Sequence, residues 1–105
     1  MIRERLHFTV KTGSAWNDAL GLIREIDEIQ IAAGLATGTV WTQVVGPFNE
    51  MVIETDFPDL ATYERESEAL MSDPAVLKLF PRFDAITVEG KGYNELLMTA
   101  ETLGP

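Results

Sequence analysis

The centre of the chain reads TVWTQVVGPFNEMVIET over residues 39–55, and this stretch decides the fold. Its two ends, residues 39–45 and 51–55, are rich in β-branched residues, which favour strands. Between them, residues 46–49 read GPFN, a composition typical of a turn. The stretch therefore predicts two strands joined as a β-hairpin.

A strand and a helix are predicted before this hairpin. Apolar and polar residues alternate over residues 2–11, which is typical of a strand with two different faces. Apolar residues then recur at helical spacing over residues 15–33, with Ser14 as the expected N-cap. Gly21 lies inside this helix, where a close backbone contact would explain it.

Three further elements are predicted after the hairpin, namely a helix over residues 60–71, a short helix over 74–79 and a strand over 93–100. Asp59 and Asp73 are suited to cap the two helices. Pro81 is expected to limit the short helix. Residues 82–92 fit either a helical tail or a β segment.

The order strand, helix, strand, strand, helix, strand predicts one α+β domain over residues 1–105. This is the ferredoxin-like βαββαβ pattern, a four-stranded antiparallel sheet with helices on one face. The expected core comprises Ile2, Phe8, Val10, Leu20, Ile23, Ile26, Leu60, Tyr63 and Leu70. Because the other face of such a sheet is bare and partly apolar, we expect a homodimer that covers it.

Composition excludes several classes of protein. A net charge of −9 disfavours nucleic acid and membrane partners, and there is no Gx4GK phosphate loop. The absence of cysteine excludes disulfides, thiolate zinc sites, iron–sulfur clusters and a cysteine nucleophile. The charged, alternating N-terminus does not resemble a signal peptide, and no segment is apolar enough to span a membrane. We therefore predict a soluble, cytoplasmic protein.

His7 is the only histidine, and the alternation places it on the bare face of the sheet. It is a candidate general acid or base, or a ligand of haem iron. The alternative is a histidine that serves only an interface. Glu54 is the second candidate catalytic residue, and Glu95 on the last strand could approach His7 across the sheet. No metal site is predicted from these residues.

Four further residues are candidates for ligand binding: Trp41, Gln43, Asn49 and Tyr93. They combine flat apolar surface with hydrogen-bonding groups, as small-molecule pockets do. Trp41 could equally belong to the core, because its register decides which face it occupies. No Gly-x-Ser-x-Gly motif is present, so serine hydrolase chemistry is not supported.

Residues 41–52, 57–65 and 72–75 together resemble the NIPSNAP family, whose pattern joins a strand, a Gly-x-x-Asn turn, a second strand, a short helix and an Asp-Pro-Ala element. The resemblance implies the dimeric α/β-barrel superfamily, in which two ferredoxin-like sheets pair by their bare faces around a cavity. Relatives include cofactor-free monooxygenases, haem-degrading enzymes and lactone isomerases. The family has no agreed catalytic residues, so none is transferred to this chain.

Three functions remain open at this point. The first is a site for a small, partly apolar molecule in the cavity of a dimeric barrel, and it leaves open whether the molecule is transformed. The second is a non-catalytic interaction or structural module. The third is a monooxygenase-type enzyme, cofactor-free or haem-linked. No cofactor is predicted from the residues themselves, because fold alone does not assign function.

Overall fold

The computed structural model describes residues 1–100, in which four strands and four helices are formed. In chain order they are β1 (Ile2–Thr9), α1 (Ala15–Ala32), β2 (Thr39–Thr42), β3 (Glu50–Phe57), α2 (Leu60–Met71), α3 (Pro74–Leu77), α4 (Phe80–Ile86) and β4 (Tyr93–Met98). None of the helices described is long and apolar enough to cross a membrane. The order agrees with the predicted βαββαβ pattern, with two short helices added before the last strand.

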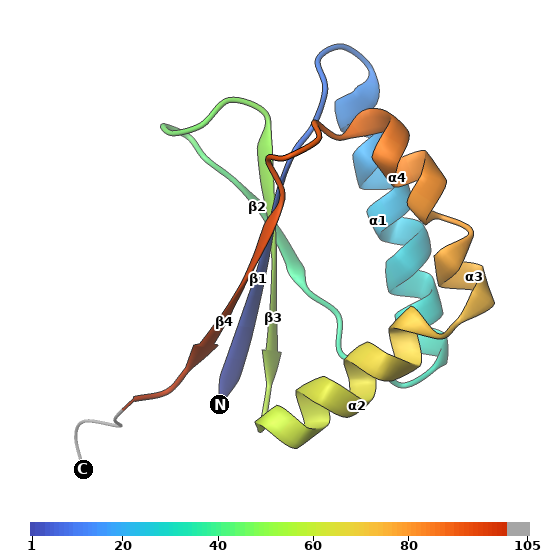
Figure 1. Cartoon of the computed structure of the whole chain (residues 1–105), viewed down its shortest axis with the longest axis vertical. Coiled ribbons are helices and arrows are strands. Elements are labelled where there is room, and N and C mark those ends of the chain that lie inside the picture. The colour runs from blue at the N-terminus through green and yellow to red at the C-terminus, as the bar shows by residue number, and fades with distance from the viewer. Residues whose placement is uncertain (101–105) are drawn as a thin grey trace.

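The strands form one sheet in the order β2-β3-β1-β4, and every neighbouring pair is antiparallel. All four helices lie on the same side of this sheet, as Figure 1 shows. The architecture is therefore the ferredoxin-like α+β fold that the sequence predicts. The opposite side of the sheet, which we call the bare face, has no helix over it.

The register of β1 assigns its side chains to the two faces. Phe8 lies opposite Met51 of β3, and both residues are buried on the helix side. They pack with Val10, Ala19 and Ile23 to form the core. His7 therefore lies on the bare face, because successive side chains of a strand point to opposite sides.

Two of the predicted helix caps are formed, and the third is not. Asp59 accepts a hydrogen bond from the amide of Thr62 at 2.7 Å, and Asp73 accepts one from the amide of Ala75 at 2.9 Å. Ser14 occupies the N-cap position of α1 with helical backbone angles and makes no side-chain cap hydrogen bond. An N-cap side chain reaches the free amides from an extended backbone, which Ser14 does not have.

The hairpin is shorter than predicted. β2 ends at Thr42, and residues 43–49 form a loop instead of continuing the strand. The chain turns at Asn49, which has a positive φ of 58°, and the carbonyl of Asn49 accepts a hydrogen bond from the amide of Val10 at 2.8 Å. The ladder between β2 and β3 cannot extend past this turn.

The ambiguous segment of residues 82–92 is helical only in its first part. α4 ends at Ile86, and the next residue, Thr87, forms an isolated bridge with Val10. Pro81 does not limit the short helix as predicted, because that helix already ends at Leu77. Pro81 lies instead in the first turn of α4, where a backbone amide would have no partner within the helix.

Two further expectations are wrong. A Cβ added at Gly21 would meet nothing within 4 Å, so no close contact requires this glycine. Leu60 is 49% exposed and does not belong to the core. The contact of α2 with the sheet is made one turn later, where the Tyr63 ring meets Phe57 edge-on at 5.3 Å between ring centres.

Candidate functional site

The cluster on the bare face is built around His7. The Nε2 atom of His7 lies 2.5 Å from Oε1 of Glu95, and its Nδ1 atom lies 3.4 Å from Oε1 of Glu50. The ring stacks on Tyr93, with 4.1 Å between ring centres and 10° between planes. Tyr93 lies directly opposite His7, whereas both carboxylates reach it from diagonal positions on β3 and β4. His7 therefore joins three strands through its side chain.

This arrangement sets what His7 can do chemically. A protonated ring donates to both carboxylates, whereas a neutral ring has one donor only. A metal bound at Nε2 would require Glu95 to move, because its Oε1 atom lies 2.5 Å from this nitrogen. Within residues 1–100, no three His, Asp or Glu side chains are arranged to hold a metal ion.

Glu50 is the member of this cluster that the sequence analysis missed. Only 8% of it is exposed, and its carboxylate also accepts a hydrogen bond from Nε2 of Gln43 at 2.6 Å. The side-chain oxygen of Gln43, Oε1, is buried and has no hydrogen-bond partner within residues 1–100. Residues 50, 52, 54 and 56 alternate along β3 in phase with the bare face, and this alternation could have identified Glu50 if the strand had been started there.

The structure thus brings together three of the six predicted site residues, His7, Gln43 and Tyr93, and separates the other three. Glu54 receives a hydrogen bond from Nε of Arg5 at 2.9 Å instead of approaching His7. Trp41 lies on the bare face of the edge strand β2, 55% exposed and opposite Val52. Asn49 shapes the loop before β3 through its backbone.

Both arginines of the bare face pair with carboxylates of the same face. Arg3 donates two hydrogen bonds to Asp56, at 2.7 and 3.0 Å. This bidentate contact holds the pKa of Asp56 below its usual range and raises the pKa of Arg3. Burial, followed by the carboxylates of Glu50 and Glu95, raises the pKa of Tyr93, so its phenol stays protonated.

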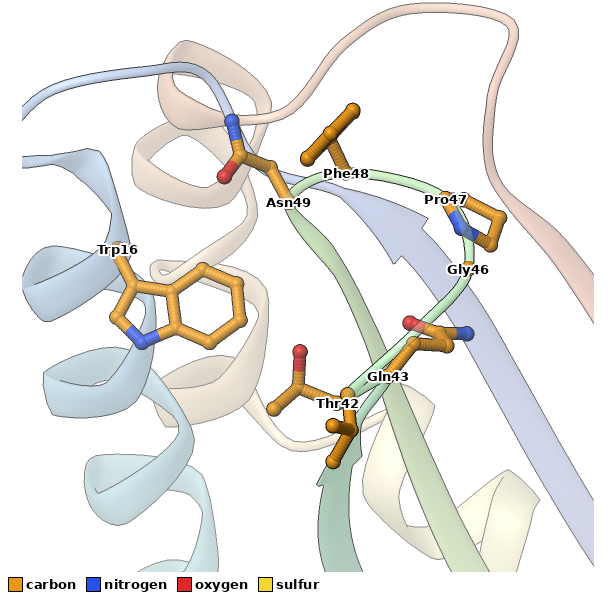
Figure 2. A pocket seen from close by; sticks show the side chains of 8 residues that line it. Trp16, Thr42, Gln43, Gly46, Pro47, Phe48 and Asn49 are labelled. Atoms are coloured by element: carbon orange, nitrogen blue, oxygen red, sulfur yellow. The ribbon is translucent and has the colours of Figure 1, made fainter.

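The loop of residues 43–49 carries exposed apolar side chains. Val44 is fully exposed, and Val45 and Phe48 are each 93% exposed. The hollow under this loop has a volume of about 260 Å³. Figure 2 shows that Trp16 of α1 faces Thr42 in this hollow, while Phe48 projects outward. Apolar side chains gathered in one loop are typical of a contact surface.

A second hollow lies between the sheet and the helices, on the side opposite the bare face, and we call it the inner pocket. Its volume is about 300 Å³, and none of the six predicted site residues lines it. Its apolar walls come from the sheet and all four helices, and include Leu6, Ile53, Ile26, Leu70, Val76 and Phe83. Leu6 points toward the helices yet is 40% exposed, because the pocket leaves its side chain uncovered.

Polar side chains of the inner pocket were also missed from the sequence. Glu4 lines it from β1, Asp27 from α1 and Asp84 from α4. Asn94 of β4 orients Glu4 by donating a hydrogen bond at 3.1 Å. A sequence signal existed, because Glu4 interrupts the apolar phase of β1 between Ile2 and Leu6. A carboxylate in that phase has to face the helices.

Comparison with known proteins gives the fold a name. No family model matches the chain, and no curated protein does. Among solved structures, protein Atu4242 from Agrobacterium tumefaciens has a TM-score of 0.76 and 25% identity, with 95% of this chain and 94% of that one covered; another structure of Atu4242 describes it as a NIPSNAP family protein of unknown function.

Two further solved structures widen this comparison. A NIPSNAP domain protein from Burkholderia xenovorans has a TM-score of 0.78 and 20% identity, with each chain covered fully. An antibiotic biosynthesis monooxygenase has a TM-score of 0.71 and 19% identity, with 96% of this chain and 100% of that one covered. This chain therefore has the ferredoxin-like fold of NIPSNAP family proteins, in agreement with the resemblance of its middle segment.

Proposed function

We propose that the chain binds a small, largely apolar molecule in the inner pocket. The observation that carries the proposal is the pocket itself, a hollow of about 300 Å³ bounded by the sheet and the helices. Small-molecule sites are concave and mostly apolar, with a few polar groups that orient the ligand. The inner pocket has this composition, since Leu6, Ile26 and Leu70 accompany Glu4 and Asp27.

The site proposed here differs from the one that the sequence suggested. The cluster of His7, Glu50 and Glu95 satisfies its own polar atoms, apart from Oε1 of Gln43. The inner pocket instead leaves Leu6 uncovered by protein. The free energy falls when a ligand removes an uncovered apolar side chain from water. The inner pocket is therefore the better candidate.

Titration calorimetry with 2-(1-naphthyl)ethanol, a probe with a bicyclic apolar body, tests this proposal. We expect saturable binding to the unmodified chain and at least about tenfold weaker binding to Leu6→Phe, which fills the pocket, corresponding to about 1.4 kcal/mol. Leu96→Phe is the matched control. Leu96 of β4 lies on the same face of the sheet as Leu6 and does not line the pocket. Equal affinity of the two variants would show that the probe binds elsewhere.

We also propose that a second copy of the chain covers the bare face. Trp41, Tyr93 and Leu97 expose 55%, 52% and 39% of their surface on this face or at its edge. The charges among them are already paired, as in Arg3 with Asp56. A chain of net charge −9 repels its copies, so a face whose arginines offset part of its acidic charge is where two copies can approach.

Light scattering at micromolar concentration tests the dimer. We expect twice the mass of one chain for the unmodified protein and for Ile31→Glu, which changes an exposed apolar residue of α1. Trp41→Glu replaces an exposed aromatic side chain of the proposed contact with a charge and should give single chains. A monomeric mass for the unmodified protein would overturn the dimer while leaving the pocket proposal intact.

A further inference from the structure

We infer that the ligand of the inner pocket carries a positively charged or donor-rich nitrogen group on its apolar body, such as a protonated amine. This inference rests on the proposed function, because it specifies the chemistry of a molecule bound in the same pocket. It follows from the charges of the pocket walls and from the way they are partnered.

The charged residues that line the pocket all have the same sign. Glu4, Asp27 and Asp84 contribute carboxylates from three different elements, so they approach the pocket from separate sides. No Lys, Arg or His is among the lining residues, all of which lie in the described part of the chain. A ligand with its own carboxylate or phosphate would be repelled by these walls.

Nearby cations do not neutralise the pocket acids. Arg82 lies in α4, two residues before Asp84, and its guanidinium pairs with Glu25 of α1 at 3.0 Å. Neither Glu4, Asp27 nor Asp84 forms an ion pair with any residue within 1–100. Glu4 is held instead by the neutral amide of Asn94. The carboxylates therefore remain available to a cation from outside the chain.

Asp27 is the acid on which a ligand cation would have the greatest effect. It lies on α1 among the apolar residues Ile23 and Ile26, which also line the pocket. Burial alone raises the pKa of its carboxyl group. A charged group that loses water without gaining a partner destabilises the chain unless something compensates for it. A cationic ligand compensates more fully than a neutral one, because its hydrogen bond to the carboxylate is charge-assisted.

A series of three probes with one apolar body tests this inference: 2-(1-naphthyl)ethylamine, 2-(1-naphthyl)ethanol and 1-naphthylacetate. The measurement is the dissociation constant of each by calorimetry at neutral pH. We expect the amine to bind at least about tenfold more tightly than the alcohol, which is about 1.4 kcal/mol of added interaction. The carboxylate should bind more weakly than the alcohol.

Asp27→Asn should reduce the preference for the amine over the alcohol severalfold, with little change in alcohol affinity. Glu28→Gln removes the same charge from the next residue, which is exposed and does not line the pocket, and should keep the preference. The triple variant Asp27→Asn, Glu4→Gln and Asp84→Asn should remove the preference. Thermal melting of each variant shows whether it is folded, and a folded Asp27→Asn chain is expected because asparagine has the same shape.

The outcomes separate this inference from the proposed function. If the alcohol binds and Leu6→Phe weakens it, but the amine binds no more tightly, the inner pocket is a ligand site and the charge inference is wrong. A preference that survives in the triple variant also overturns the inference. If neither the amine nor the alcohol binds, the proposed function fails and the inference fails with it.

Discussion

On the bare face of the sheet, both arginines lie beside carboxylates, whereas the carboxylates of the inner pocket form no ion pair within residues 1–100. Arg3 with Asp56 and Arg5 with Glu54 are examples of the first arrangement. Asp27 is the example of the second, and the two arrangements shift carboxyl pKa values in opposite directions. Both faces belong to one sheet only four strands wide.

The difference teaches which face each kind of partner suits. A surface whose charges are paired within the chain has a lower desolvation cost when another protein surface covers it than a surface with unpaired charges, because each charge keeps its partner. A pocket whose acids are unpaired favours a ligand that supplies the missing charge. The fold therefore separates two proposed contacts: a second copy of the chain on the bare face, and a small molecule in the inner pocket between the sheet and the helices.

The largest expected effect lies on the helix side. Ile23 is 5% exposed and packs in the core, so Ile23→Ala should lower the free energy of unfolding by about 2–5 kcal/mol. Ile31 lies on the same helix and is 68% exposed, and Ile31→Ala should cost less than about 0.5 kcal/mol. Urea denaturation measures both. A loss below about 1 kcal/mol for Ile23→Ala would show that α1 does not carry the core.

A smaller effect is expected at Gly38, which lines the inner pocket where β2 begins. A Cβ at Gly38 would lie 2.5 Å from Oγ1 of Thr55 and 2.9 Å from the carbonyl oxygen of Glu54. The backbone has to move, so Gly38→Ala should cost about 1–3 kcal/mol. The same movement should change affinity for 2-(1-naphthyl)ethanol.

Gly21→Ala is the contrasting change for this measurement. Gly21 is inside α1 with open space around it, and alanine there should stabilise the chain by about 0.5–1 kcal/mol. Opposite signs at the two glycines would confirm that the backbone is closely packed at Gly38 and not at Gly21. A loss of stability for both variants would contradict it.

Strict alternation made much of the bare face predictable from sequence. The period of two in β1 placed His7 on that face. Glu95 was expected to approach His7 from the last strand, and in the structure it lies 2.5 Å from the His7 ring. Glu50 was missed because the residues before it have turn composition, and sequence does not fix where a strand starts after a loop. Tyr93 was predicted to bind a ligand, and its stacking on His7 depends on a register that no local pattern encodes.

The inner pocket could not be predicted in the same way. Periodicity identifies the apolar face of a helix, but it does not give the distance between that face and the sheet. Ile26 and Leu70 were expected to be core residues, and in the structure they line a hollow. Only Glu4 gave a signal, as a carboxylate in the apolar phase of a strand.

The smallest expected effects are opposite pH dependences for Asp27 and Asp56. Burial raises the pKa of Asp27, so its contribution to stability is present below the unfolded pKa of about 4 and is lost as pH rises through the folded pKa. The hydrogen bonds from Arg3 lower the pKa of Asp56, so its contribution is present above about pH 4 and is lost as pH falls through the folded pKa.

At pH 7, Asp27→Asn should therefore be slightly more stable than the unmodified chain, and Asp56→Asn slightly less stable. Both differences should shrink toward acid, because each aspartate then becomes neutral like the asparagine that replaces it. Urea denaturation at several pH values between about 3 and 7 measures them, a range that spans the usual carboxyl pKa. A loss of stability for Asp27→Asn at pH 7 would mean that this carboxylate already has a partner within the chain, and the contrast between the two faces would not hold.

Addition of 2-(1-naphthyl)ethylamine sharpens the test. The amine should stabilise the unmodified chain more than Asp27→Asn, because only the aspartate offers the amine an opposite charge.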